Sequence, residues 1–229
     1  MKKLLVIFLL TLVTKSAILA QTTVDLIPSG GYTFADRTGF GNSYSKVDGA
    51  GNLGGSIMFN VNRRFGVELQ YSHMSTTTGL YYYGGVPISY GDLKADYIML
   101  GFVPYLGDPN APVRPFLGGL IGAGVFSPGV DGPSDTKFTL GAEFGADMYV
   151  TPRFGFRVKA QVMSPFDYGT GYYAGNDASG APYAAQSNLF QFSLNAGVII
   201  GLGRELPPAQ RRVMYGRPRP RYYRPYPYY

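Results

Sequence analysis

The sequence predicts an all-β protein: an eight-stranded antiparallel up-and-down transmembrane β-barrel followed by a disordered C-terminal tail. Three observations lead to this prediction. Apolar and polar residues alternate in segments of about ten residues, as in membrane-spanning strands. The connections between these segments are alternately short and long. The chain of 229 residues contains 32 Gly, 20 Tyr and 15 Phe, a composition typical of strands and turns rather than of packed helices.

The first twenty residues have the features of an export signal. Lys2 and Lys3 precede an apolar run over residues 4–13, and small residues lead to Ala20. That run is well short of the roughly 20 residues that a membrane-spanning helix needs. We therefore expect a signal peptide over residues 1–20, cleaved near Ala20, a barrel over residues 21–203 and a tail over residues 204–229.

Eight strands are expected in the barrel, and their regularity differs. The first two, 24–34 and 53–61, alternate loosely, whereas the third, from Phe65 to Ser75, sets apolar Val67 and Leu69 against Glu68. The fourth and fifth, 93–105 and 113–126, are again less regular. The alternation is clearest in the last three strands, which cover residues 137–150, 154–162 and 190–202. Each of these three has one continuous apolar face, as expected for contact with lipid.

The connections also alternate along the chain. Residues 62–64, 107–112 and 151–153 form short links, and the long links are residues 36–52, 76–92, 127–135 and 164–188. Outer-membrane barrels have short periplasmic turns and longer external loops, and an even number of strands brings both chain ends to the periplasm.

The short turns predict which residues face one another. If Val150 lies opposite Phe154, then Asp147 lies opposite Arg157, and Glu143 opposite Gln161. The same reasoning about residues 62–64 places Met58 opposite Glu68. An ionic network is therefore expected inside the barrel, with Lys159 within reach of both Glu143 and Asp147; its members are Glu68, Glu143, Asp147, Arg157 and Lys159. Because an eight-stranded barrel is just wide enough to be filled by side chains, we expect a plugged lumen.

The last strand carries a family resemblance. The segment over residues 195–202, NAGVIIGL, is similar to the signal read by the barrel-assembly machinery, with Asn195, Gly197, Ile200 and Leu202 at the characteristic positions. With the signal peptide and the strand pattern, the chain resembles the small outer-membrane barrels of the outer membrane protein A type, which occur in Gram-negative bacteria including Bacteroidetes. The resemblance implies insertion by that machinery into the cell outer membrane, among its lipid and lipopolysaccharide. It implies no particular activity, and the pattern departs by ending in Leu202 rather than an aromatic residue.

Composition excludes several kinds of chemistry. The chain has no Cys and a single His, His73, so thiol nucleophiles, Cys-ligated metals and sites needing two imidazoles are excluded. His73 has Ser72 and Ser75 nearby, the residue types of a lipid hydrolase. However, it continues the apolar face of its strand, which indicates an interfacial histidine pointing away from any enclosed acid. We expect no catalytic, cofactor or metal site, and a non-enzymatic structural or interaction role. A narrow solute channel or a lipid-modifying enzyme remains the alternative.

A secreted soluble barrel or sandwich would show the same alternation. Here the polar face carries charges at mid-strand, and the apolar face is rich in Phe, Ala, Gly and Val with little large aliphatic bulk. Lipid tolerates such a face better than a close-packed core does, so the membrane interpretation is favoured.

The positive charge is concentrated at the chain ends. Residues 21–203 contain ten Lys or Arg and thirteen Asp or Glu, whereas residues 204–229 contain seven Arg and one acid. In the tail, Arg217, Arg219, Arg221 and Arg224 alternate with Pro and Tyr, a pattern that forms no core. We expect either an anionic periplasmic partner for this tail or a solvated tail with no specific partner, and no nucleic acid because the chain is exported.

Overall fold

The structure is a computed structural model, and it describes residues 23–40, 43–82, 87–108, 111–128, 134–151, 153–166, 172–176, 182–185 and 190–202. The expected signal peptide over residues 1–20 and the expected tail over residues 204–229 lie outside the described residues.

Twelve strands make up the described part of the chain. They are β1 (Thr23–Thr33), β2 (Asp36–Phe40), β3 (Ser43–Val47), β4 (Ala50–Asn60), β5 (Phe65–Tyr82), β6 (Pro87–Pro104), β7 (Val113–Pro128), β8 (Asp135–Thr151), β9 (Phe154–Pro165), β10 (Tyr172–Asn176), β11 (Pro182–Ala185) and β12 (Gln191–Leu202). Among these residues, no helix is long and apolar enough to cross a membrane.

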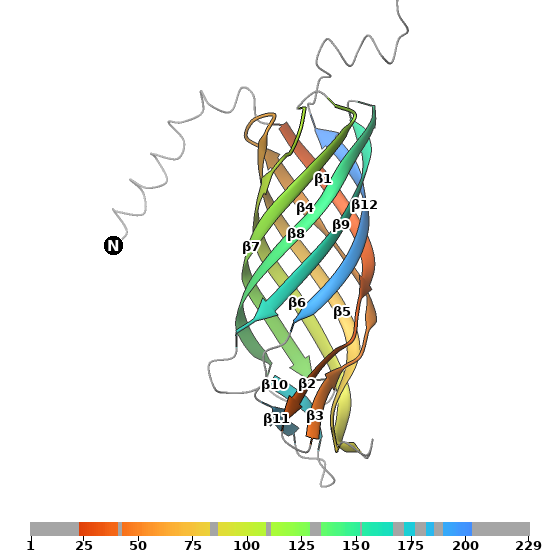
Figure 1. Cartoon of the computed structure of the whole chain (residues 1–229), viewed down its shortest axis with the longest axis vertical. Helices are drawn as coiled ribbons and strands as arrows, with labels where there is room; N and C mark the ends of the chain where they lie inside the picture. Colours follow the sequence, from red (N-terminus) through yellow and green to blue (C-terminus); the bar gives the residue numbers. More distant parts are fainter. Residues whose placement is uncertain are drawn as a thin grey trace, which may run out of the picture.

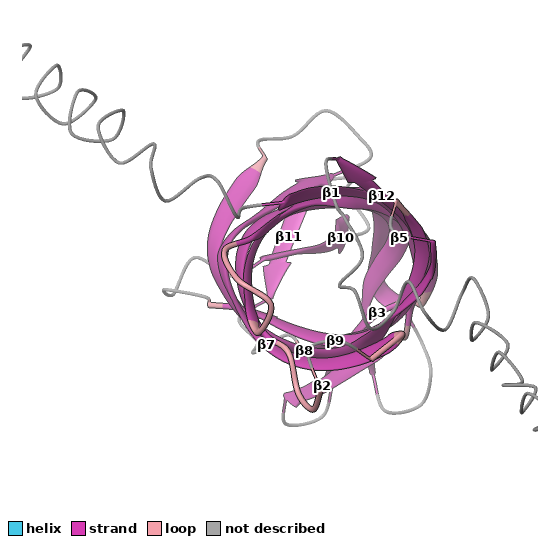
Figure 2. Ribbon diagram, turned by 90° about the horizontal axis from the view of Figure 1, so that it is seen from above, coloured by secondary structure: helices cyan, strands magenta, loops and turns pink. Residues whose placement is uncertain are grey.

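Eight of the strands form a closed antiparallel barrel, as the sequence predicts. Around the ring the order of paired strands is β1, β4, β5, β6, β7, β8, β9 and β12, and β12 pairs again with β1. The pairing of Val24 with Leu202 closes the ring, which is visible when the molecule is viewed along its axis (Figure 2). The eight-stranded barrel predicted from alternation is confirmed.

The two ends of the barrel differ in construction (Figure 1). One end, here called the turn end, carries the start of β1, the end of β12 and the short connections; there the N–H of Gly201 donates to the carbonyl of Arg153 at 2.9 Å. The other end, here called the hairpin end, carries β2, β3, β10 and β11. The short links therefore lie at one end of the barrel and the long links at the other, as expected.

The register predicted across the short turns is confirmed, with one correction. Asp147 lies opposite Arg157, and Met58 opposite Glu68. The predicted pair of Val150 with Phe154 is wrong, because an irregularity next to the turn places Thr151 opposite Phe154 instead. An extra residue at a hairpin end shifts the pairing locally and leaves the register beyond it unchanged.

All four expected long links are partly strand, and three of them contain longer strand segments. β5 and β6 continue through most of residues 76–92, β2 and β3 lie within residues 36–52, and β10 and β11 lie within residues 164–188. Along β5, β3 pairs with residues from Thr78 to Tyr82 and so extends the sheet beyond the end of β4. The links are long, as expected, but parts of them are strand, because backbone groups of neighbouring segments satisfy one another by pairing.

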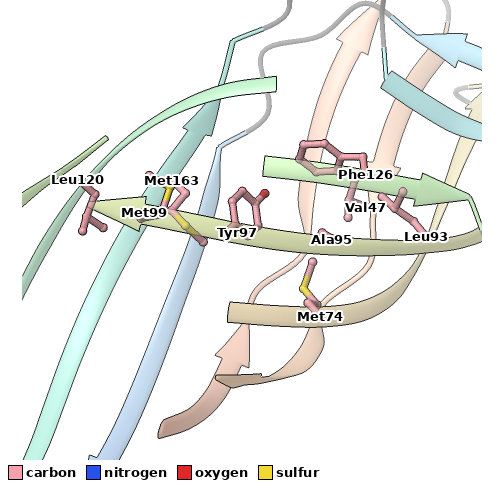
Figure 3. Packing of buried hydrophobic residues seen from close by; sticks show 9 residues of the cluster. All are labelled: Val47, Met74, Leu93, Ala95, Tyr97, Met99, Leu120, Phe126 and Met163. Carbon is pink, nitrogen blue, oxygen red and sulfur yellow. The ribbon is translucent and has the colours of Figure 1, made fainter. Parts of the chain in front are cut away.

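Buried apolar side chains form two clusters inside the barrel. The first contains Val47, Met74, Leu93, Ala95, Tyr97, Met99, Leu120, Phe126 and Met163, and Figure 3 shows it in detail. The second contains Ile27, Met58, Val103, Tyr105, Phe116 and Ile199. Along β6, Met99 belongs to the first cluster and Val103 to the second, while Gly101 between them lies opposite Glu68. A polar layer therefore lies between the two apolar clusters.

Candidate functional site

The polar layer is centred on Arg157, which binds two carboxylates. Its Nε donates to Asp147 Oδ1 at 2.6 Å and its Nη2 to Asp147 Oδ2 at 2.9 Å, a bidentate arrangement. Its Nη1 donates to Glu68 Oε2 at 2.9 Å. Glu68 and Asp147 are 0% exposed and Arg157 is 3% exposed. Charged hydrogen bonds of this kind are strong, and they offset the cost of removing the charges from water only because each charge is paired.

Lys159 is the second cation of the layer, and all three of its donors are used. Its Nζ lies 2.7 Å from Glu143 Oε2, 2.8 Å from Gln70 Oε1 and 3.3 Å from Glu68 Oε1. The sequence placed Lys159 within reach of Glu143 and Asp147; in the structure it reaches Glu143 and Glu68, while Asp147 is bound by Arg157. The five residues predicted to form an ionic network are thus brought together, and Glu68 links the two cations.

Glycines make room for these long side chains. Glu68 lies opposite Gly101, Glu143 opposite Gly118, Lys159 opposite Gly145, and Arg157 opposite Gly197. A Cβ on Gly118 would lie 2.9 Å from Cγ of Glu143, which is closer than real Cβ contacts. In a barrel of only eight strands, small residues beside the charged ones supply the space that the network occupies.

Toward the turn end the network continues through Tyr105 and Asn60 to further polar side chains. The hydroxyl of Tyr105 lies 3.0 Å from Asp147 Oδ2 and 3.3 Å from Asn60 Oδ1, and Asn60 Nδ2 donates to Asp25 Oδ2 at 2.8 Å. The guanidinium of Arg114 lies 3.7 Å from the centre of the Tyr105 ring, a cation–π contact. Asn60, Tyr105 and Arg114 were not predicted as members. Their inward positions follow from the alternation, but the contacts join strands distant in sequence.

The space left beside the network is small. A cavity of about 10 Å³ lies next to Arg157 and Lys159, lined also by Ser29, Ser56 and Asn195. That volume corresponds to about one water molecule. Within the part of the chain that the structure describes, no group of three or more His, Asp or Glu side chains is arranged to hold a metal ion.

The residues of the expected assembly signal lie on β12. Ile200 and Leu202 are exposed on the outward face, whereas Asn195 and Gly197 lie on the inward face. A Cβ on Gly197 would lie 2.8 Å from the carbonyl oxygen of Pro28 on β1, so this position is closely packed at the seam where the barrel closes. The four tail arginines, Arg217, Arg219, Arg221 and Arg224, lie outside the described residues.

A second polar group, centred on His73, lies on the outward wall. The ring of His73 has Nδ1 2.8 Å from Asp96 Oδ1 and Nε2 3.2 Å from Ser75 Oγ. Tyr71 donates its hydroxyl proton to the same Asp96 oxygen at 2.6 Å. His73 points outward and away from the enclosed acids, as predicted, but it has an acid partner that was not predicted. The acid is on the same outward face, because His73 and Asp96 are directly paired across β5 and β6.

Two hollows adjoin this outward group, which we call the wall triad (Ser75, His73, Asp96). Next to it, on the side toward the turn end, is an apolar groove of about 460 Å³, lined by Tyr71, Ile98 and Gly55 among others. On the other side is a hollow of about 550 Å³ whose lining includes Ser75 and Lys94. This hollow occurs where β5 changes neighbours, because its pairing with β4 ends at Met74 and its pairing with β3 begins at Thr78.

No family model and no curated protein matches the sequence. Among solved structures, Neisserial surface protein A, from Neisseria, has a TM-score of 0.52 at 18% identity, over 77% of this chain and 96% of that chain. The N-terminal β-barrel domain of OprF from Pseudomonas aeruginosa has a TM-score of 0.43 at 15% identity, over 80% and 98% of the two chains. Ail, the attachment invasion locus protein of Yersinia pestis, has a TM-score of 0.40 at 16% identity, over 79% and 98%. The chain therefore has the fold of the small eight-stranded outer-membrane β-barrels.

Proposed function

We propose that this chain is an integral outer-membrane protein whose barrel is a closed scaffold with a structural or interaction role. The observation that carries the proposal is the distribution of side chains: apolar ones are exposed on the outside of the barrel and charged ones are buried inside, the reverse of a soluble protein. Every barrel strand exposes a large apolar side chain outward: Leu26, Ile57, Leu69, Leu100, Ile121, Phe144, Val158 and Leu194 are all more than a third exposed. The charged residues of the ionic network are buried inside. Soluble monomers rarely expose a continuous apolar surface of this extent.

The orientation follows from the two ends of the barrel. Short turns and both ends of the strand series lie at the turn end, which is the periplasmic end in outer-membrane barrels. The hairpin end then faces the outside. In this arrangement the β2–β3 hairpin contacts the outer leaflet and its lipopolysaccharide, while the Arg-rich tail is available to an anionic periplasmic partner. Insertion by the barrel-assembly machinery, through the signal on β12, belongs to the same proposal.

A closed lumen is the second part of the proposal. The ionic network crosses the lumen, a cavity beside Arg157 and Lys159 measures only about 10 Å³, and apolar clusters lie on either side of the network. Moving a solute along the axis would require breaking buried ion pairs, which is costly. We therefore infer that the barrel does not conduct.

Membrane integration is tested by expressing the full chain in a Gram-negative host. We expect the mature protein to need detergent for extraction and to migrate faster on gels when unheated than after boiling. Recovery from the periplasm or medium without detergent would show that the outward apolar faces are covered in some other way, and the membrane proposal would fail.

The closed lumen is tested separately by reconstituting the detergent-purified protein in planar bilayers. We expect no unitary conductance above that of bilayers treated with detergent alone. Steps of reproducible size from heat-modifiable, folded protein would contradict the closed lumen and favour a narrow channel.

A further inference from the structure

The wall triad has the connectivity of a nucleophile, a base and a residue that orients the base. With the imidazole proton on Nδ1, His73 donates to Asp96 Oδ1 at 2.8 Å, and Nε2 is free to accept the proton of the Ser75 hydroxyl 3.2 Å away. Recognition of a serine hydrolase rests on this geometry and these roles rather than on sequence position. We propose that the wall triad is an esterase site that cleaves long-chain acyl esters of membrane amphiphiles.

Strand geometry explains why these three groups meet. Residues two apart on a strand share a face, so Ser75 follows His73 on the outward side of β5. Asp96 lies directly opposite His73 on β6, at the distance of cross-strand side-chain pairs. An interfacial histidine without a reaction partner would need only one polar neighbour. Here both ring nitrogens have one, and one of them is a hydroxyl.

The position of the triad matches a substrate that is half apolar. On β5 and β6 the outward residues on one side, Leu69, Tyr71 and Ile98, are apolar and exposed. On the other side they are polar, as in Lys94, which lies directly opposite Ser75. The triad therefore lies at the boundary of the apolar surface, where the ester group of a membrane amphiphile would be found.

The two hollows supply a place for each half of such a substrate. An acyl chain fits the apolar groove, where the outward-facing Gly55 contributes no side chain between Leu53 and Ile57 of β4. The head group fits the polar hollow lined by Ser75, Asp92 and Lys94. A molecule occupying both would pass over Tyr71 and bring its ester carbonyl to Ser75. Lys94 would then lie on the head-group side, where its charge favours an anionic head group or the developing oxyanion.

The reaction is a hydrolysis in two steps. Ser75 Oγ attacks the ester carbonyl carbon while His73 Nε2 accepts its proton, and the C–O bond to the alcohol breaks as His73 returns that proton to the leaving oxygen. Water then attacks the acyl-serine, again losing a proton to His73, and the fatty acid leaves as Ser75 recovers its hydrogen. Asp96 acts as a positioning residue that holds the Nδ1 tautomer of His73. No oxidant, metal or cofactor is consumed.

The first test is covalent labelling of the full chain, purified in detergent micelles, with a fluorophosphonate probe. We expect one modified residue, Ser75, identified by mass spectrometry of the digested protein. Ser75→Ala should abolish the label, whereas Ser164→Ala should retain it. Ser164 is a matched control because it also lies on the outward wall, opposite Leu140 rather than a histidine. Absence of label from folded, heat-modifiable wild-type protein would overturn the proposal, as would labelling that persists in Ser75→Ala.

The second test measures hydrolysis of p-nitrophenyl laurate and p-nitrophenyl acetate. We expect turnover of the long-chain ester to fall by about 10²- to 10⁴-fold in Ser75→Ala and His73→Asn, the range that acid–base groups contribute. Asp96→Asn should lower kcat at unchanged KM, and Asp96→Glu should recover part of the loss. Rates that are equal in wild type and Ser75→Ala would show that the triad does no chemistry.

Two sources of the long-chain ester remain, and vesicles separate them. The protein is incubated with phospholipid vesicles in one arm and with purified lipopolysaccharide in the other, and released fatty acid is quantified by mass spectrometry. Release from either source, lost in Ser75→Ala, supports the esterase and identifies the substrate class. Release from neither source would reject the proposal, because hydrolysis of p-nitrophenyl esters alone is not cleavage of a membrane amphiphile. The closed, membrane-integrated barrel would stand in that case, because its own tests do not involve Ser75.

Discussion

The polar groups inside the barrel and those on its outer wall both pair a nitrogen-bearing side chain with a carboxylate, but at opposite degrees of exposure. Inside, Glu68 and Asp147 are fully buried, and Arg157 is bound by both. Outside, the side chain of His73 is 40% exposed, and its partner Asp96 is 29% exposed. A buried charge that loses its partner has no water to replace it, whereas an exposed one does. The difference indicates that the interior groups contribute to stability and that the wall groups are free to react or bind.

The largest effect is expected from breaking the interior network at Arg157. Arg157→Leu leaves Asp147 and Glu68 buried with one cation fewer, so the free energy of unfolding should fall by about 3–5 kcal/mol, as when other buried pairs are broken. Urea unfolding of the protein in micelles measures the loss. Arg153→Leu is the matched control, because Arg153 is exposed next to its turn, and it should change stability by less than about 0.5 kcal/mol.

A double variant sharpens this test. Combining Arg157→Leu with Asp147→Asn removes one of the stranded charges and should recover part of the loss, so the two changes should couple by about 0.5–3 kcal/mol. Strictly additive losses would show that Asp147 and Arg157 do not interact, in contradiction of the bidentate pair.

The next effect tests the space that glycine provides beside the network. In Gly118→Ala the new Cβ would lie 2.9 Å from Cγ of Glu143 and 3.2 Å from the Phe102 carbonyl oxygen, and we expect a loss of about 1–3 kcal/mol from overpacking. Gly119 is the adjacent control, since it faces outward and a Cβ there meets nothing within 4 Å. Equal stability of the two alanine variants would mean that the interior is looser than described.

A smaller effect is expected at the hairpin end. Asp48 pairs with Lys46 and accepts a hydrogen bond from Thr77 Oγ1 at 2.8 Å, which connects the β3–β4 turn to β5. Partial burial alone would raise the pKa of Asp48, but the hydrogen bonds from Lys46 and Thr77 outweigh it and hold the pKa below its usual value. Asp48→Asn should cost less than about 1 kcal/mol because the pair is partly exposed.

The pH dependence of that variant follows from the direction of the shift. A lowered pKa in the folded state stabilises the fold above the unfolded pKa of about 3.9, and this contribution is lost as the pH falls through the folded value. The wild type should therefore exceed Asp48→Asn in stability at pH 6, and the difference should shrink as the pH falls below the unfolded pKa. A difference that grows on acidification would contradict this account of Asp48.

The smallest effect on the barrel is expected from removing the tail. A chain truncated after Glu205 should unfold like the full chain, because the barrel closes through β1 and β12 without the tail. Binding to anionic vesicles should weaken in the truncated chain. It should weaken as well at high salt, since exposed charges are screened over about 8 Å at physiological ionic strength. A tag after Tyr229 that is labelled from outside intact cells would reverse the proposed orientation.

Part of the candidate sites could be predicted from the sequence because it depends on local geometry. Alternation placed Glu68, Glu143 and Lys159 on the inward face, and a three-residue turn set Asp147 opposite Arg157. The same alternation placed His73 outward. It could not reveal Asp96 as the partner of His73. The link between β5 and β6 was expected to be a long loop, and a long loop does not define the register of the two strands that it joins. Nor could the alternation reveal that Glu68 joins the two cations.

The sequence by itself determined the quantities that repeat along the chain: the number of barrel strands, the face of each side chain and the pairing next to short turns. These follow from the period of two in a strand and from the few residues of a tight turn. Only the tertiary structure decided what meets across the barrel and along its outer wall. Glu68 reaches Arg157 and Lys159 at separations of 89 and 91 residues, because closure of the ring fixes the stagger of all eight strands together. No local pattern encodes that stagger, since it is a property of the closed sheet.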